Sequence, residues 1–313
     1  MTLSVVIPAH GREELLVRCL RSLGPDRQET AAVEICVVDD GSGLDEGRIR
    51  TCIEPAFGGA HSQTPFLIWR AFPSPRGRSA ARNEGVRATS GDIVVFHDSD
   101  MEAREGFLAA HLAAHIACPK TAVIGRIIWP RGGGFLRYIG SRGVAKLRPG
   151  DAVPPWYFVT NNASVERCDL PGDAPFDETI TGWGGEDLDL GLTLARAGIG
   201  FARAQDAVSY HHVRVKLAEH LELTFAYGRD SLPVLVGKHS ELRRILRLDL
   251  LDKFVWRLMV SGAVFRPTAA FAQALDFLPL PEAVYDYLTF SAYARGWKEA
   301  MREENRDTEH AMD

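Results

Sequence analysis

Two carboxylates one residue apart are the first feature of this sequence that could do chemistry. Asp98 and Asp100 flank Ser99 one residue after the apolar run 93–96, with His97 between. In an extended backbone, side chains two positions apart point the same way, so both carboxylates could approach one cation. Mg²⁺ and Mn²⁺ prefer such oxygen ligands, and the ion would neutralise a departing diphosphate. The alternative is a solvated turn, because this short pattern is common.

A second acidic pair stands in the string TGWGGEDLDL. Trp183 offers a flat apolar face that suits a sugar ring, and Gly184 and Gly185 permit close approach of a substrate. Glu186 and Asp187 open a predicted helix, where acidic residues also simply stabilise the first turn. We predict that Asp187 is a general base for an attacking hydroxyl and that Glu186 holds hydroxyl groups.

Two adjacent histidines, His211 and His212, follow about one helix and one strand later. Neutral imidazole is a common metal ligand, so one of them could complete the site that contains Asp100. Adjacent residues of an extended chain point in opposite directions, so only one should reach the ion. We favour His212, and His211 stays the alternative.

Candidate nucleotide contacts follow the first two predicted strands. Asp39 and Asp40 precede a Gly-Ser pair, and a carboxylate there could accept from a base N–H or from ribose hydroxyls. The alternative is a plain turn, because Asp-Asp-Gly-Ser is favourable turn chemistry. Pro8 and His10 lie at the end of the first predicted strand and could form a wall for the base.

Basic residues near the start of a predicted helix could bind the diphosphate. Arg78, Arg82 and Asn83 lie around this helix start. Arginine binds phosphate groups in a bidentate way, and a helix N-terminus adds dipole support for the same anion. Asp98 and Ser99 are further candidates on the nucleotide side of the site.

Short apolar runs alternate with amphipathic segments through the first half, which is the pattern of an α/β protein. This order predicts a mostly parallel central sheet flanked by helices. Ligands then bind beyond the carboxyl ends of the strands, where the polar residues above are found. The predicted strands cover 3–9, 33–38, 66–72 and 92–96, and the predicted helices cover 15–23, 79–88 and 105–117.

The second half is less regular. Residues 130–156 are rich in glycine, proline and arginine and predict a long loop, whereas the charged tail from Glu299 predicts fraying. The C-terminal segments have a helical pattern, and simple packing is favoured over a lid, a dimer face or a membrane-surface helix. The predicted domains are a catalytic domain at 1–213, with a nucleotide-binding half at about 1–120 and an acceptor-binding half at about 121–213, and a helical extension at 214–313.

Composition excludes several classes of protein. The chain has 313 residues, of which 46% are hydrophobic and 25% charged, which is ordinary globular composition. The net charge of -5 argues against nucleic acid as a partner. Five cysteines without a C-x-x-C pattern favour reduced thiols in a cytoplasmic protein. The N-terminus predicts a strand rather than a signal peptide, and no apolar stretch predicts a transmembrane helix.

Several of these segments together resemble the family-2-type glycosyltransferases of the GT-A fold. The resemblance covers about residues 3 to 212 and implies a nucleotide-sugar donor, usually a UDP-sugar, together with Mn²⁺ or Mg²⁺. The matching strings, in the order of the family, are SVVIPAHGREELLVRCLRSL, VEICVVDDGS, GRSAARNEG, GDIVVFHDSD and TGWGGEDLDLGLTLARAG, followed by YHH.

The resemblance also implies roles for individual residues. Asp40 matches the position that binds the nucleobase, and the D-x-D at residues 98–100 matches the one that binds ribose and metal. Trp183, Glu186 and Asp187 resemble the acceptor and base motif of galactosyl- and N-acetylgalactosaminyl-type transferases. That motif implies an inverting enzyme, in which one carboxylate deprotonates the acceptor.

Two rival functions stay open. A nucleotidyltransferase also uses paired aspartates on an α/β sheet, but it would carry a glycine-rich basic loop where this chain has PAHGREE. A non-catalytic carbohydrate-binding protein on the same fold would have lost a catalytic carboxylate. This chain keeps all four candidates, which are Asp98, Asp100, Glu186 and Asp187.

His10 stands where the family more often has an aromatic residue. The acceptor could be a glycan, peptide, lipid or small molecule, and peripheral membrane contact stays open.

Overall fold

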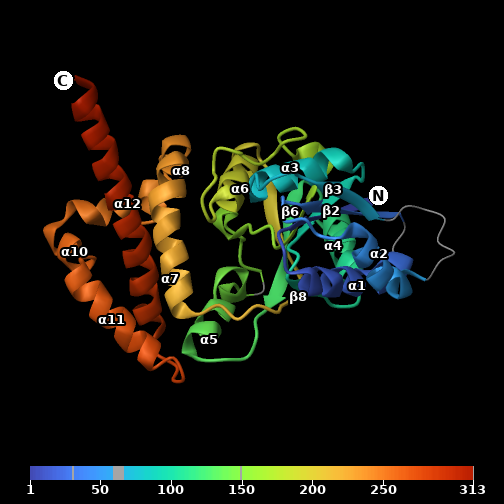
Figure 1. The fold of residues 1–313 in the computed structure, drawn as a ribbon, viewed down its shortest axis with the longest axis horizontal. Coiled ribbons are helices and arrows are strands. Elements are labelled where there is room, and N and C mark those ends of the chain that lie inside the picture. The colour runs from blue at the N-terminus through green and yellow to red at the C-terminus, as the bar shows by residue number, and fades with distance from the viewer. Residues whose placement is uncertain (30–31, 59–66, 149, 313) are drawn as a thin grey trace. The chain divides into compact units, whose positions relative to one another are not determined.

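The chain folds into two compact units, which are drawn as a ribbon in Figure 1. The computed structural model describes residues 1–29, 32–58, 67–148 and 150–312. The predicted division after residue 213 stays a prediction, because compact units need not be independently folding domains. Unit 1 comprises Met1–Pro130, Arg142–Glu178 and Glu186–Val213, and unit 2 comprises Arg131–Ser141, Thr179–Gly185 and Arg214–Asp313.

Unit 1 is an α/β structure, as predicted, and its sheet is mixed rather than mostly parallel. Its described strands form one eight-stranded sheet in the order β3-β2-β1-β4-β7-β6-β8-β5. The strand pairs from β3 to β4 are parallel, whereas β7 is antiparallel to both of its neighbours. The strands are β1 (Leu3–Ala9), β2 (Val33–Asp39), β3 (Leu67–Ala71), β4 (Ile93–His97), β5 (Met101–Ala103), β6 (Thr121–Ile128), β7 (Asn162–Glu166) and β8 (Gly200–His211).

Side chains of the central strands alternate between two hydrophobic cores, because successive residues of a strand face opposite sides. Val5 and Val95 pack in one core with α1 and α4. Val6 and Val94 pack in the other with α3 and α6. Burial on both faces explains the uniformly apolar strands. These helices are α1 (Glu13–Glu29), α3 (Arg78–Ala88), α4 (Phe107–Ala117) and α6 (Glu186–Arg196), and α2 (Glu46–Ile53) also belongs to unit 1.

The predicted long loop at 130–156 is wrong in part, because short helices interrupt it. These helices are α5 (Gly134–Gly140), η2 (Gly143–Lys146) and η3 (Pro155–Tyr157). Gly134 and Phe135 donate their backbone N–H groups to Asp276, which anchors the start of α5 within unit 2. Phe66, the first residue of the predicted third strand, lies outside the described residues.

Unit 2 is helical, and its last helix, α12, continues to Met312. The fraying of the tail from Glu299 stays a prediction. In the described part of the chain, no helix combines the length and apolarity needed to cross a membrane. The further helices are α7 (Leu217–Ala226), η5 (Tyr227–Ser231), α8 (Leu232–Lys238), α9 (Leu242–Ile245), η6 (Leu248–Asp252), α10 (Phe254–Met259), α11 (Gly262–Ala274) and α12 (Glu282–Met312).

Glycines allow α12 to approach the end of α7 closely. A Cβ atom at Gly296 would overlap the carbonyl oxygen of Phe225. We therefore expect Gly296→Ala to lower the free energy of unfolding by about 1–3 kcal/mol. The matched control is Gly237→Ala on α8, where nothing lies within 4 Å of the added atom. At Gly237, alanine should stabilise the helix by roughly 0.5–1 kcal/mol. Both variants are measured by urea denaturation, and equal effects of the two substitutions would contradict the close approach at Gly296.

Candidate active site

A buried arginine gathers three carboxylates at the carboxyl edge of the sheet. Arg82 lies on α3 and is only 2% exposed. Its Nη2 atom lies 3.0 Å from Asp98 Oδ1, which follows β4, and its Nη1 atom lies 2.9 Å from Glu186 Oε1, which begins α6. The same Nη1 lies 3.8 Å from Asp187 Oδ1. Burial opposes the charge, yet the three carboxylates raise the pKa of Arg82 above its ordinary value.

This geometry corrects the roles that the sequence suggests for two residues. The sequence predicts that Arg82 holds a diphosphate, but its guanidinium is surrounded by the protein's own carboxylates. Asn83 is predicted to contact the nucleotide, but it is fully buried and bonds the backbone of Phe176 and the carboxylate of Glu178. Arg78 is exposed at the start of α3 and stays a candidate for the diphosphate.

Asp187 has the environment of a general base. Thr160 Oγ1 donates a hydrogen bond to its Oδ1 atom, and its side chain is 26% exposed and therefore reachable. Burial and the negative charge of Glu186 raise the pKa of Asp187 to about 6, although Arg82 opposes this shift. A carboxylate with a pKa near the operating pH accepts a proton more effectively than an ordinary one.

Thr160 and Glu178 were not found from the sequence, because neither lies in a recognisable motif.

A histidine from β8 faces the second aspartate of the D-x-D. His211 Nε2 lies 3.8 Å from Asp100 Oδ2. Its Nδ1 atom lies 2.9 Å from the Val213 carbonyl oxygen, to which a protonated Nδ1 donates, and 3.2 Å from the Val213 backbone nitrogen, from which an unprotonated Nδ1 accepts. In the tautomer with the proton on Nδ1, the lone pair of Nε2 faces the carboxylate, as in many histidines that bind metal. The ring also stacks on Trp129, with 4.4 Å between the ring centroids.

The electrostatics of the D-x-D favour a bound cation. Burial and the neighbouring charge of Asp98 raise the pKa of Asp100. Burial also opposes the ionisation of Asp98, but Arg82 and Arg78 hold its pKa below the ordinary value. Asp100 and His211 together offer one oxygen and one nitrogen to an ion, and Asp98 retains a second oxygen beside the one that faces Arg82. This donor set fits Mn²⁺ or Mg²⁺.

The preference for His212 as the metal-reaching residue needs correction. Its Nε2 atom lies 2.5 Å from Glu102 Oε2, and its Nδ1 atom lies 3.0 Å from Arg18 Nη1. Both ring nitrogens of His212 therefore already contact charged side chains, Glu102 and Arg18. The alternation of side chains along a strand predicts that one histidine reaches the ion, but it does not indicate which of the two faces Asp100.

The two aspartates after β2 hold loops. Asp39 accepts hydrogen bonds from the backbone N–H groups of Ser42 and Leu44. Asp40 Oδ1 lies 2.6 Å from the backbone nitrogen of Arg76, and its Oδ2 atom lies 3.0 Å from that of Gly77. Both carboxylates are therefore committed to the protein backbone, as in the plain turn that was the alternative interpretation. Spare lone pairs still permit a nucleobase contact.

The remaining nucleotide candidates lie at the same edge. His10 is exposed, and its Nδ1 atom donates to the Asp40 carbonyl oxygen over 2.8 Å, which links the ends of β1 and β2. Pro8 is half-buried within β1. Ser99 is half-buried between the two aspartates of the D-x-D. These placements are compatible with a nucleotide at the carboxyl edge of the sheet.

The glycine-rich segment that precedes Glu186 belongs to unit 2. Trp183 meets His220 edge to face, with 6.5 Å between the ring centroids. Gly184 and Gly185 have φ values of +78° and +105°, which side chains with a Cβ rarely adopt. A Cβ atom on Gly185 would also lie 2.8 Å from Leu235. The glycines are therefore needed for the backbone path that leads into α6.

Comparison with known proteins identifies the family. Residues 4–165 match the family described as Glycosyl transferase family 2. The chain is 30% identical to YfnE of Bacillus subtilis strain 168, a protein named as an uncharacterized glycosyltransferase. That match covers 74% of this chain and 70% of YfnE. The chain therefore belongs to glycosyl transferase family 2. It spans about half the length of several other curated glycosyltransferases that it matches.

Solved structures share the GT-A fold. The mannosyltransferase PcManGT of Pyrobaculum calidifontis, in complex with GDP-Man and Mn²⁺, gives a TM-score of 0.59 at 17% identity, covering 95% of this chain and 85% of that chain. TarS 1-349 of S. aureus, in complex with UDP, gives a TM-score of 0.58 at 17% identity. That match covers 97% of this chain and 92% of that chain. At this identity, the two structures establish the fold and not the substrate.

Proposed function

We propose that this glycosyltransferase is an inverting, divalent-cation-dependent enzyme that uses a UDP-hexose or a UDP-N-acetylhexosamine. The observation that carries the proposal is the carboxylate cluster around Arg82, which lies at the sheet edge that also holds the Asp100–His211 pair. UDP in TarS and Mn²⁺ with GDP-Man in PcManGT support a nucleoside diphosphate donor and a cation. The acceptor, whether glycan, peptide, lipid or small molecule, is not part of the proposal.

The chemistry follows from the positions of the carboxylates. Asp187 takes the proton of the acceptor hydroxyl as its oxygen attacks the anomeric carbon of the donor sugar. The new glycosidic bond forms while the bond from the anomeric carbon to the diphosphate oxygen breaks, which inverts the configuration. A divalent cation held by Asp100, His211 and Asp98 would supply charge neutralisation for the departing diphosphate.

Residues of the chain position the reactants around these groups. Arg82 keeps Glu186 and Asp187 in place, and Glu186 is the candidate for holding sugar hydroxyls. Trp183 stays a candidate for stacking on a sugar ring. We further propose that residues 1–120 form the nucleotide-binding half and residues 121–213 the acceptor-binding half. The five free cysteines fit the proposed reducing, cytoplasmic location.

The test of the proposal is donor hydrolysis. The purified chain is incubated with a panel of UDP- and GDP-sugars, with Mn²⁺, with Mg²⁺ or with EDTA, and the released nucleoside diphosphate is measured. We expect UDP to be released from a UDP-sugar. This release should require the cation and should become faster when an acceptor is present. Pyrophosphate release from UTP and a sugar phosphate would instead identify a nucleotidyltransferase. Sugar binding without any release would support the carbohydrate-binding alternative.

The raised pKa of Asp187 predicts how transfer depends on pH. Only the ionised carboxylate can accept the acceptor proton, so activity should rise with pH through the pKa of about 6 and level off above it. At one pH unit below that pKa, the rate should be roughly a tenth of the plateau. The measurement is kcat over a pH series at saturating donor. A flat profile between pH 5 and 8 would contradict the role of Asp187.

A further inference from the structure

Exposed apolar side chains are concentrated in one stretch of unit 2. Of the eleven large apolar residues that are exposed in the described chain, seven lie between residues 254 and 278. Four of them belong to α10, where Phe254 is 79% exposed, and Phe277 after α11 is 71% exposed. We call the exposed apolar residues of 254–278 the α10 face. Exposed apolar surface of this kind marks an interaction site when its side chains form one patch.

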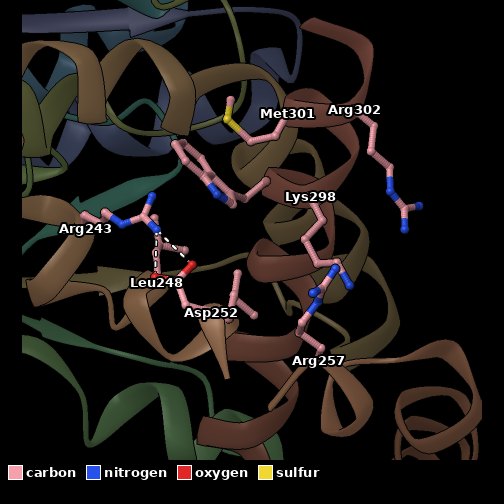
Figure 2. Close-up of a pocket in the computed structure, with 9 residues that line it drawn as sticks. Arg243, Leu248, Asp252, Arg257, Lys298, Met301 and Arg302 are labelled. Atoms are coloured by element: carbon pink, nitrogen blue, oxygen red, sulfur yellow. Dashed lines mark hydrogen bonds and ion pairs between the residues drawn. The ribbon is translucent and has the colours of Figure 1, made fainter. Parts of the chain in front are cut away.

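A positively charged cavity adjoins this face. The cavity has a volume of about 450 Å³ and is shown in Figure 2. Arg257 of α10 and Lys298 of α12 point toward one another, and Arg302 lies on the next turn of α12. Asp252, on the same wall, is already paired with Arg243 over 3.0 Å. Burial, followed by the charges of Arg302 and Arg257, lowers the pKa of Lys298. The positive charge at the cavity is therefore in excess.

We propose that the α10 face docks on an anionic lipid bilayer and that the cavity beside it takes a lipid phosphate. Interfacial helices combine exposed aromatic and aliphatic side chains with basic residues at their flanks. The segment 243–257 carries five basic and only two acidic residues, which complements an anionic leaflet. The sequence favours simple packing for these helices, and the exposure of α10 argues for the membrane-surface alternative. This proposal does not depend on the transfer activity.

Vesicle cosedimentation of the full chain tests the apolar part. We expect binding to phosphatidylcholine vesicles that contain phosphatidylglycerol, and weak binding to phosphatidylcholine alone. The double variant Phe254→Ser and Leu258→Ser should bind the anionic vesicles at least about tenfold more weakly. The matched control is Ile116→Ser, because Ile116 is 67% exposed in unit 1 and should not matter. Equal losses in both, or no binding by the unchanged protein, would overturn the proposal.

Charge variants test the cavity. Arg257→Gln with Lys298→Gln should reduce binding to anionic vesicles and weaken its dependence on salt. Arg48→Gln, at an arginine whose side chain is 71% exposed in unit 1, is the control and should change neither. Donor hydrolysis should be unaltered in all these variants, so a failure of this proposal is distinguishable from a failure of the proposed function. Self-association that is lost in the apolar double variant, without vesicle binding, would instead identify a second copy as the partner.

A second cluster of ligand-type side chains lies at the opposite edge of the sheet in unit 1. Glu166 ends β7 and pairs with Ile93 at the start of β4, whereas the D-x-D follows the end of β4. Cys168 and Asp169 follow in the short helix η4 (Arg167–Asp169). One ligand atom from each of Glu166, Cys168 and Asp169 lies within 4.8 Å of the others. This cluster is therefore separate from the candidate active site.

A buried histidine points into this cluster with one nitrogen unused. His115 is fully buried, and its Nε2 atom lies 2.8 Å from Ser164 Oγ. Its Nδ1 atom has no hydrogen-bond partner and lies 3.9 Å from Glu166 Oε1. That oxygen and Asp169 Oδ2 are also buried without a partner. His115 Nδ1 and Glu166 Oε1 are thus two neighbouring buried atoms without a partner, which is costly unless a ligand binds them.

We infer that His115, Glu166, Cys168 and Asp169 form a zinc-type metal site. Nitrogen, carboxylate and thiolate donors together are the set that Zn²⁺ selects. Ligand atoms around a tetrahedral zinc lie roughly 3.4–3.7 Å apart. His115 Nδ1 lies 3.9 Å from Glu166 Oε1, and Cys168 Sγ lies 3.9 Å from the other oxygen, Glu166 Oε2. Each pair is within a few tenths of an ångström of this value. Binding would also deprotonate the Cys168 thiol.

Cobalt substitution tests this site in the full chain. The variant Asp100→Asn serves as the background, which weakens metal binding at the D-x-D. We expect one equivalent of Co²⁺ to give a thiolate charge-transfer band that Zn²⁺ abolishes. Cys168→Ser should remove the band and Glu166→Gln should weaken binding at least about tenfold. Cys52→Ser, on α2, should leave it unchanged. No band, or a band that survives Cys168→Ser, would overturn the inference.

Discussion

Asp187→Asn should reduce kcat by about 10²–10⁴-fold while leaving donor binding nearly unchanged. Asparagine has the shape of aspartate and can still accept the hydrogen bond from Thr160. It cannot take a proton from the acceptor, so only the chemical step should suffer. The measurements are steady-state transfer rates and UDP binding by calorimetry. Loss of donor binding in this variant would show that Asp187 serves the donor instead.

The same variant should be more stable than the unchanged protein at neutral pH. The pKa of Asp187 is about 6 in the folded chain and about 3.9 in an unfolded one, so the fold disfavours its ionised form. The stability that this carboxyl contributes when protonated is lost as pH rises from about 4 to 6. Asparagine avoids this loss, so the free energy of unfolding at pH 7.5 should rise by roughly 1–3 kcal/mol. Asp206→Asn, at an exposed aspartate of β8, is the control and should change neither property.

The part of the fold that could be predicted from the sequence depends on local pattern. Apolar runs such as residues 93–96 could only be strands buried on both faces, and the order of strands and helices implied an α/β sheet. Because polar residues followed the strand ends, Asp98 and Asp187 were expected at one edge, and Arg82 does link them there. Strand topology accounts for Asp98, which follows β4, whereas Asp187 is placed by the start of α6.

The details that the sequence did not indicate depend on contacts between distant residues. The pattern around Arg82 resembled any basic helix start, and only its burial beside three carboxylates distinguishes it from the exposed Arg78. His211 and His212 are equivalent in sequence, and the partners Val213 and Glu102 decide which one faces Asp100. Glycine and proline in 130–156 suggested a loop, yet Asp276, far along the chain, anchors a helix there.

Arg82→Met should destabilise the protein more than any other single substitution in the candidate active site. Methionine fills a similar volume but leaves Glu186, which is 4% exposed, without its cationic partner. Removal of one partner from a buried ion pair costs about 3–5 kcal/mol, because the remaining charge stays buried and unpaired. Without Arg82, which opposes the raised pKa of Asp187, that carboxyl should bind a proton more readily, so the loss of stability should be larger at pH 8 than at pH 5. Urea denaturation at the two pH values measures both effects.

A comparison with Arg76→Met separates burial from charge. Arg76 makes an ion pair of 3.0 Å with Glu178, but both side chains are partly exposed, so its loss should cost at most about 1 kcal/mol. Arg82→Lys keeps one charge but cannot reach Asp98 and Glu186 with two separate nitrogens, so its stability should lie between those of the other two variants. If both methionine variants lost the same stability, the ion pairs of Arg82 would contribute no more than an exposed ion pair. If Arg82→Met kept its stability and lost only transfer, the arginine would act on the substrate and not on the carboxylates that surround it.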